Sequence, residues 1–229
     1  MTGDDAAVVL LSGGMDSATA AYETAADGFA LHALHISYGQ KTADVEAACA
    51  RDLAAALDVE EFLTVDTEHL QRIGGSSLTD AAIPVADADV TSETIPSSYV
   101  PFRNANLLSM AVSFAETAGC SRVVIGAHSE DYAGYPDCRP AFFDAFQHVA
   151  DLGTKPETSI TIASPFATWS KTEIVRRGSD LGVPFGQTWS CYRHAPPACG
   201  TCDSCAYRLE AFANAGMTDP IEYEHGMTH

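Results

Sequence analysis

The sequence predicts an α/β protein built on a parallel, doubly wound sheet of the Rossmann-like kind. Three observations lead to this class: short apolar runs alternate with amphipathic helical stretches, the apolar runs are continuous, and a Gly-Gly turn follows the first of them. Continuous apolar strands are typical of a parallel sheet that helices cover on both faces. In such sheets ligands bind beyond the carboxyl ends of the strands.

The expected elements follow in order along the chain. Runs rich in Val, Ile, Leu and Phe predict strands over 6–11, 29–37, 60–66, 122–127 and 159–166. Amphipathic periodicity predicts helices from the glycine turn to about residue 26, and over 44–59, 104–119, 141–151 and 171–182. Between them, residues 67–101 are irregular and too long for a passive connector, and such loops are usually functional.

Charge is the unusual feature of the composition. Twelve Lys and Arg residues stand against 31 Asp and Glu, for a formal net charge of −19, while 46% of the residues are hydrophobic, which excludes disorder. Scattered acidity with only three lysines favours a salt-loving host, because halophiles use high negative charge to stay dispersed. The alternative is an acidic protein that avoids nucleic acid.

Targeting signals are not apparent. The first residues carry no basic segment, and no run of about 18 apolar residues suits a bilayer. We therefore expect a cytoplasmic protein with no membrane partner and no direct nucleic-acid partner.

The first glycine turn predicts an anion site. Ser12-Gly13-Gly14-Met15-Asp16-Ser17 joins a strand to a helix, so that main-chain N–H groups and the helix dipole face one point. The two serines add hydroxyl donors, and Asp16 suits a metal ion that bridges phosphates. A serine-capped tight turn is the alternative.

This six-residue signature resembles the pyrophosphate-binding loop of the ATP pyrophosphatase superfamily, which splits ATP between its α and β phosphates. The resemblance implies ATP as co-substrate. We expect the nucleotide-binding residues to be Leu11, Ser12, Gly13, Gly14, Met15, Asp16, Ser17, Ala18, Thr19, Ala20 and Ala21.

Four cysteines near the end of the chain predict a metal site. Cys191 is followed by Cys199, Cys202 and Cys205 at C-x-x-C-x-x-C spacing, which suits one structural Zn²⁺ per subunit. An iron–sulfur cluster fits the same spacing, and free structural thiols are a third interpretation. We accordingly expect a nucleotide and substrate domain over 1–186 and a zinc-binding segment over 187–229.

Two polar, aromatic blocks predict a site for a flat heteroaromatic ligand. One lies at the start of the expected helix at 104, and the other directly follows the strand at 122–127. Tyrosines stack on such rings and carboxylates accept from a guanine-like N–H edge, whereas a solvated acidic loop is the alternative. The candidate residues are Tyr99, Arg103, Asn104, Asp131, Tyr132, Tyr135, Asp137 and Arg139.

Lys171 stands at a helix start, where a cation is electrostatically unfavourable. A polyphosphate nearby would resolve this conflict. A lysine that points into water is the alternative.

Together these blocks resemble the QueC family over nearly the whole chain. The motifs are S-G-G-M-D-S at 12–17, Y-V-P-F-R-N at 99–104, E-D-Y-A-G-Y-P-D-C-R at 130–139, W-S-K-T-E-I-V at 169–175, and T-W-S-C-Y with three further cysteines over 188–205. Two departures stand out. Phe102 occupies a position where the family usually has glycine, and R-H-A-P-P-A at 193–198 replaces a Gly-Gly/His stretch, with all four cysteines retained.

The resemblance implies the ATP-dependent conversion of 7-carboxy-7-deazaguanine and ammonia to 7-cyano-7-deazaguanine. It further implies adenylated carboxylate and amide intermediates, Mg²⁺ on the phosphates, a homodimer, and a product that feeds archaeosine or queuosine in tRNA. By motif position, Lys171, Asp131 and Arg103 are the candidate catalytic residues.

Two other functions are also compatible with these motifs. A sulfur- or lysine-transferring enzyme that acts on tRNA would need a basic surface, and the chain has only twelve basic residues. A nucleotide-binding module with a zinc ribbon, without chemistry, would bind ATP and leave the carboxylic acid unchanged.

Overall fold

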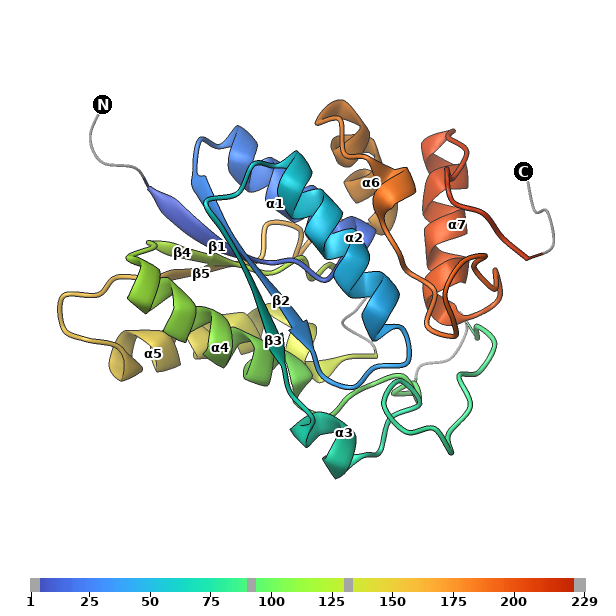
Figure 1. The fold of residues 1–229 in the computed structure, drawn as a ribbon, viewed down its shortest axis with the longest axis horizontal. Helices are drawn as coiled ribbons and strands as arrows, with labels where there is room; N and C mark the ends of the chain where they lie inside the picture. The colour runs from blue at the N-terminus through green and yellow to red at the C-terminus, as the bar shows by residue number, and fades with distance from the viewer. Residues whose placement is uncertain (1–4, 90–93, 130–133, 225–229) are drawn as a thin grey trace.

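The computed structural model describes residues 5–89, 94–129 and 134–224, and it confirms the predicted fold class (Figure 1). Five parallel strands form one sheet in the order β3-β2-β1-β4-β5. The strands are β1 Ala6–Leu10, β2 Ala30–Ser37, β3 Glu61–Asp66, β4 Arg122–Val124 and β5 Thr161–Ala163. The predicted residues Asp131 and Tyr132 lie outside the described ranges.

Helices cover both faces of this sheet. All five expected helices are present, as α1 Met15–Ala26, α2 Ala43–Ala56, α4 Arg103–Ala118, α5 Pro140–Gly153 and α6 Lys171–Asp180. Two helices were not predicted, α3 His69–Ile73 and α7 Asp203–Ala215, and two short 3₁₀ turns are η2 Pro136–Cys138 and η3 Phe185–Gln187. Within the described ranges, no helix combines the length and apolar character needed to cross a bilayer.

The alternation of side chains along β1 divides the core into two layers. Ala7 and Val9 pack with α1, α2, α6 and α7, whereas Val8 and Leu10 pack with α4 and α5 on the opposite face. Both layers are visible on either side of the sheet in Figure 1. Because the strand after β1 lies on one side and β4 on the other, the switch point of the topology is the carboxyl end of β1.

The C-terminal segment is joined to this core through α7. Phe212 of α7 belongs to the same buried cluster as β1, and its ring meets that of Phe185 edge-on at 5.2 Å. The fully buried Arg208 donates to both carboxylate oxygens of Asp219, at 2.7 and 3.0 Å, and to the hydroxyl of Thr188 at 2.7 Å. Charged and apolar contacts together fix the segment beside the glycine turn.

The irregular segment after α3 also forms hydrogen bonds with the C-terminal segment. The Arg193 guanidinium donates to the carbonyl of Val85 at 3.1 and 3.2 Å and to the carboxylate of Asp87 at 2.7 Å. The backbone N–H of Ala88 donates to the carbonyl of Thr201 at 2.8 Å. The segment therefore links the middle of the chain to the cysteine-rich end.

Candidate functional site

A cavity of about 220 Å³ opens at the switch point, where β1, β2 and β4 end. Its walls come from the glycine turn, from the first residues of α4 and α6, and from the C-terminal segment. Of the residues predicted from the sequence, those that line it are Leu11, Ser12, Gly14, Asp16, Ser17, Arg103, Asn104, Tyr135 and Lys171. The structure thus brings the turn, the lysine and part of the expected heteroaromatic site into one space.

Hydroxyl hydrogen bonds shape the glycine turn. The Ser12 N–H donates to Ser17 Oγ at 3.2 Å, and the two serine hydroxyls lie 3.0 Å apart. Ser17 Oγ also donates to the carbonyl of Gly14 at 3.0 Å, while the Gly14 N–H donates to Ser12 Oγ at 3.3 Å. The remaining predicted nucleotide residues of α1 do not line the cavity, since they face the core; they are Met15, Ala18, Thr19, Ala20 and Ala21.

Gly13 allows the turn to approach α2. Its φ of +86° lies in the left-handed region, and a Cβ there would sit 2.4 Å from the backbone oxygen of Glu46. A backbone atom cannot move aside like the end of a side chain, so any larger residue displaces the turn.

The Gly13→Ala substitution is expected to lower the free energy of unfolding by about 1–3 kcal/mol and to weaken nucleotide binding. Gly28→Ala is the matched control, because Gly28 has a similar φ of +92° and open space around its Cβ position. Urea unfolding of both variants separates the clash from the backbone strain. Equal losses in the two would contradict a role for the close approach to α2.

A buried charge cluster lies beside the turn. Residue Lys171 is 9% exposed. Its Nζ atom lies 2.9 Å from His128 Nε2 and 3.4 Å from Asp16 Oδ2. Because an ammonium group only donates, His128 Nε2 is the acceptor, and this assigns the ring proton to Nδ1. The lysine therefore points into the cavity and away from bulk water.

The local sequence explains this direction. Ser170 caps α6: its hydroxyl accepts from the Glu173 N–H at 3.3 Å, and the Glu173 carboxylate accepts from the Ser170 N–H at 2.8 Å. This capping box fixes the first turn, so that Lys171 leaves it toward the ends of β1 and β4. In that cluster Asp16 Oδ1 is buried and has no hydrogen-bond partner among the described residues.

Arg103 is the second cation of the cavity. It donates from Nη1 to the hydroxyl of Tyr38 at 3.0 Å, and its guanidinium carbon lies 5.6 Å from the centre of that ring. Burial by itself lowers the pKa of Arg103, but the nearby tyrosine hydroxyls, Tyr38 first, raise this pKa above its ordinary value. The group consequently stays positive in the wall of the cavity.

The other predicted heteroaromatic-site residues have different surroundings. Asp137 is buried and accepts from the backbone N–H of Asn104 at 2.8 Å, so it supports the start of α4 and does not line the cavity. Tyr99 accepts from the Phe102 N–H at 3.1 Å and also lies outside the lining. Arg139 is exposed at the start of α5.

Sequence reasoning missed several residues of the cavity wall, namely Tyr38, Glu46, His128, Trp189, Ser190, Tyr192 and Ser204. His128 carried a usable signal, because it follows β4 at the edge where parallel sheets bind ligands. Glu46 and Ser204 lie within helices, and no spacing in the sequence distinguishes them from other helical residues.

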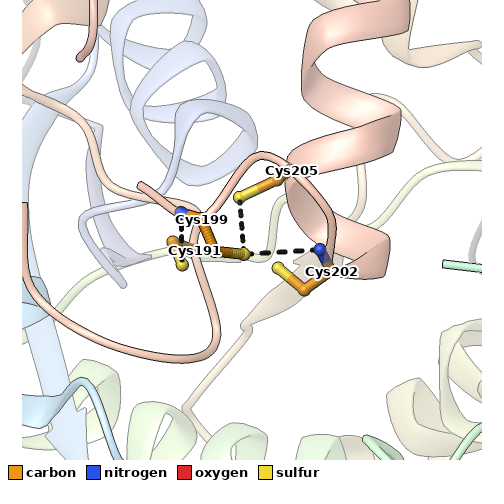
Figure 2. Close-up of side chains that lie close together, drawn as sticks. All are labelled: Cys191, Cys199, Cys202 and Cys205. Carbon is orange, nitrogen blue, oxygen red and sulfur yellow. Dashed lines mark hydrogen bonds between the residues drawn. The ribbon is translucent and has the colours of Figure 1, made fainter. Parts of the chain in front are cut away.

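The four cysteines of the C-terminal segment converge, as Figure 2 shows. Their sulfur atoms all lie within 4.8 Å of one another, and all four side chains are buried. Backbone N–H groups point at two of them: the Cys199 N–H donates to Cys191 Sγ at 3.5 Å, and the Cys202 N–H donates to Cys199 Sγ at 3.4 Å. This donor set suits a tetrahedral metal ion that prefers thiolates.

The cysteine cluster and the glycine turn are directly connected. The Trp189 N–H donates to the carbonyl of Gly13 at 2.8 Å, and the Trp189 indole N–H donates to the carbonyl of Cys191 at 3.1 Å. One residue thus ties the turn to the first cysteine of the cluster.

Comparison with solved structures gives the same fold. An NMN synthetase from Francisella tularensis matches with a TM-score of 0.52 and 15% identity, over 93% of this chain and 78% of that one. A 4-thiouridine synthetase in complex with RNA and bound ATP matches with a TM-score of 0.52 and 17% identity, over 93% of this chain and 50% of that one.

Sequence comparison gives the family. Curated proteins named 7-cyano-7-deazaguanine synthase match from Haloarcula marismortui (63% identity, 100% of this chain and 99% of the relative), Halobacterium salinarum (61%, 95% of each) and Chlorobaculum parvum (55%, 95% and 96%). The haloarchaeal relatives agree with the salt-loving host that the acidity predicts. The name of these relatives, a synthase, agrees with the enzyme class expected from the sequence. Because the family model described as "Queuosine biosynthesis protein QueC" matches residues 6–216, the chain belongs to the QueC family.

Proposed function

We propose that this chain converts 7-carboxy-7-deazaguanine and ammonia to 7-cyano-7-deazaguanine with consumption of ATP. The observation that carries the proposal is a single cavity shared by the serine–glycine turn, a buried lysine and a half-buried arginine. Such a cavity suits a polyphosphate and an organic acid held side by side. The names of the curated relatives support the same substrate class.

The chemistry requires two activations. A carboxylate is a poor electrophile until one oxygen becomes part of a leaving group, and transfer of the adenylyl group to that oxygen releases pyrophosphate and provides it. Ammonia then displaces AMP and gives the amide. A second adenylylation, on the amide oxygen, followed by loss of AMP and a proton from nitrogen, gives the nitrile. The contribution of the protein is positioning and charge neutralisation.

We assign the pyrophosphate to Ser12, Gly13, Gly14 and Ser17, with Lys171 neutralising the charge that develops on it. The cluster of Lys171 with His128 and Asp16 supports this role, because it keeps an ammonium group beside the turn. Asp16 fits Mg²⁺, since its buried Oδ1 lacks a hydrogen bond among the described residues. When bound, Mg²⁺ would neutralise phosphate charge.

We assign the deazaguanine acid to the wall formed by Arg103, Asn104 and Tyr135. Arg103 offers a permanent positive charge to the carboxylate, and Tyr135 offers a ring for stacking. Tyr99 and Asp137 support this wall, because the ring centre of Tyr99 lies 6.1 Å from that of Tyr135 and Asp137 accepts from the Asn104 N–H at 2.8 Å. Arg139 is assigned to the site by motif position alone. Asp131 and Tyr132 complete the proposed site by motif position.

We propose that the four cysteines hold one structural Zn²⁺ per subunit, and that the segment over 187–229 is a metal-stabilised wall of the cavity. Buried thiolates within 4.8 Å of one another are the donor set that zinc prefers. Zinc binding contributes folding free energy to a segment that, apart from α7, has little regular structure. We further propose a homodimer whose product feeds archaeosine or queuosine in tRNA.

Loss of the metal is expected to weaken binding of ATP at the glycine turn. Cys202→Ser should lower the metal content and weaken ATP binding roughly 3- to 10-fold, because the Trp189–Gly13 hydrogen bond depends on the ordered cluster. Cys120→Ala is the control, since Cys120 is buried in the core on the α4 face of the sheet. Metal analysis and calorimetry with ATP check this. Full ATP affinity in metal-free protein would contradict the connection.

Incubation in high salt with Mg²⁺, ATP, ¹⁵N-ammonia and 7-carboxy-7-deazaguanine tests the proposed function. Mass spectrometry should detect the amide and then the nitrile, both with one ¹⁵N atom. Unchanged acid would remove the proposal. A second incubation with tRNA, ATP and a labelled sulfur donor or labelled lysine tests the rival function, because a tRNA-modifying enzyme of that kind would transfer the label to the tRNA.

A further inference from the structure

A half-buried carboxyl group of the cavity has no part in the function proposed so far. Glu46 lies in α2 and lines the cavity, together with Arg103 of α4. Burial raises the pKa of Glu46 above its usual range, although hydrogen bonds from Thr42 and Gln40 limit the rise. A carboxylate in such a wall is costly without partners, so the contacts that hold it there are informative.

Two donors fix the orientation of the Glu46 carboxylate. The Thr42 hydroxyl donates to Oε1 at 2.5 Å, and the Gln40 amide donates to Oε2 at 2.9 Å. Thr42 is the residue before α2, where a side chain often accepts a hydrogen bond from the helix. Its hydroxyl accepts none and instead donates to Glu46. Gln40 is itself held, because its Oε1 accepts from the Tyr38 N–H at 2.9 Å. Capping of α2 therefore does not explain why Thr42 and Gln40 both donate to the Glu46 carboxylate.

Acceptor capacity remains on the same group. An ionised carboxylate offers about four acceptor positions, and the two donors from Thr42 and Gln40 occupy one on each oxygen. One position per oxygen is therefore left, which suits two parallel N–H donors from a ligand in the cavity.

The nearby cation does not use this capacity. Arg103 acts on Glu46 through its charge and limits the rise in its pKa, yet the two form no ion pair within the described part of the chain. Arg103 donates to the hydroxyl of Tyr38 instead, at 3.0 Å. The cavity consequently presents a separate acceptor and a separate cation, which complement a ligand with a donor edge and an acidic group.

From this geometry we propose that Glu46 determines specificity by accepting the ring N–H and the 2-amino hydrogens of the guanine-type edge. The proposal rests on the proposed function, because it assigns the ring edge of the same substrate. The carboxylate of that substrate would then face Arg103. Ligands without the 2-amino group leave one Glu46 oxygen without a donor in a wall that the bound ligand shields from water, and they should be rejected for that reason.

Binding measured without ATP tests the proposal apart from catalysis. Calorimetry in high salt compares 7-carboxy-7-deazaguanine with the analogue that lacks the 2-amino group. The wild-type protein should prefer the amino compound by roughly 10- to 100-fold. Glu46→Gln should weaken binding of the amino compound by a similar factor and remove most of the preference, with ATP affinity unchanged.

Two further variants keep the result interpretable. Asp44→Asn removes an exposed carboxylate from the same helix and should leave the preference unchanged. Thr42→Val keeps the Glu46 carboxylate but removes one donor that orients it, so the preference should fall in part. An unchanged preference in folded Glu46→Gln, or a wild-type protein that binds both compounds equally, would overturn the proposal. So would a variant that loses ATP and acid binding alike. Failure of the proposed function itself would appear separately, as wild-type protein that leaves the acid unconverted.

Discussion

The Lys171→Met variant is expected to form the nitrile about 100- to 1,000-fold more slowly than the wild-type protein at saturating ATP. Methionine keeps an apolar stem of similar length in a position that is 9% exposed, so packing around His128 and Asp16 is largely preserved. The substitution removes the positive charge that lies beside the turn. Negative charge on the departing pyrophosphate then loses its nearest buried cation, and the barrier to adenylyl transfer rises.

Steady-state kinetics with product detection by mass spectrometry checks this expectation. Lys155→Met is the control, because Lys155 is an exposed lysine outside the cavity and its loss removes the same charge from the surface. Metal content should equal that of the wild-type protein in both variants. Wild-type turnover in Lys171→Met would reject the role assigned to the lysine.

The Arg208→Met variant is expected to lose about 3–5 kcal/mol of unfolding free energy, because removal of one partner leaves a buried charge uncompensated. Arg208 and Asp219 have side chains that are 0% and 3% exposed, with Nε and Oδ2 at 2.7 Å. Arg208 also holds the hydroxyls of Thr188 and Ser190, at 2.7 and 3.1 Å, on either side of Trp189. The loss should therefore loosen the contact between the C-terminal segment and the glycine turn.

Arg72→Met provides a matched comparison. Arg72 and Glu68 form an ion pair at the same 2.7 Å, but their side chains are 78% and 71% exposed. Exposed pairs contribute about 0–1 kcal/mol, so this variant should differ little from the wild-type protein. Denaturant unfolding at constant salt measures both. Similar losses in the two variants would show that burial does not determine the strength of the Arg208 pair.

The strands were predictable because parallel sheets require continuous apolar segments. The order of strands and helices is as predicted, although β4 and β5 end earlier, at Val124 and Ala163. Residues beyond those points, such as Ile125 and Gly126, line the cavity. These apolar residues form part of the cavity wall. From composition alone, an apolar residue in the wall looks the same as an apolar residue in a paired strand.

Elements that depend on tertiary contacts were not predictable. Helix α7 begins within the cysteine motif and contains Cys205, and its buried face is completed by Arg208 and Phe212, which contact Phe185 on an earlier turn of the chain. Glu46 illustrates the same limit for the site. Its proposed role depends on the cavity wall that it shares with Arg103 of α4, a residue far from it in the chain.

The site residues that were predictable share a local cause. The serine–glycine turn and the cysteine cluster each depend on residues at short spacing, so the chemistry is visible in the sequence itself. Residues 18–21 of α1 are buried on every side of the helix and do not line the cavity, so their place in the expected nucleotide site stays a prediction.

The central claim is that one cavity holds ATP and the deazaguanine acid together, so that the acid attacks the α phosphate. Exchange of labelled pyrophosphate into ATP, measured without ammonia, tests it most directly. We predict exchange that requires 7-carboxy-7-deazaguanine and is nearly abolished in Lys171→Met. Exchange without the acid, or release of ADP and phosphate in place of AMP and pyrophosphate, would contradict the account.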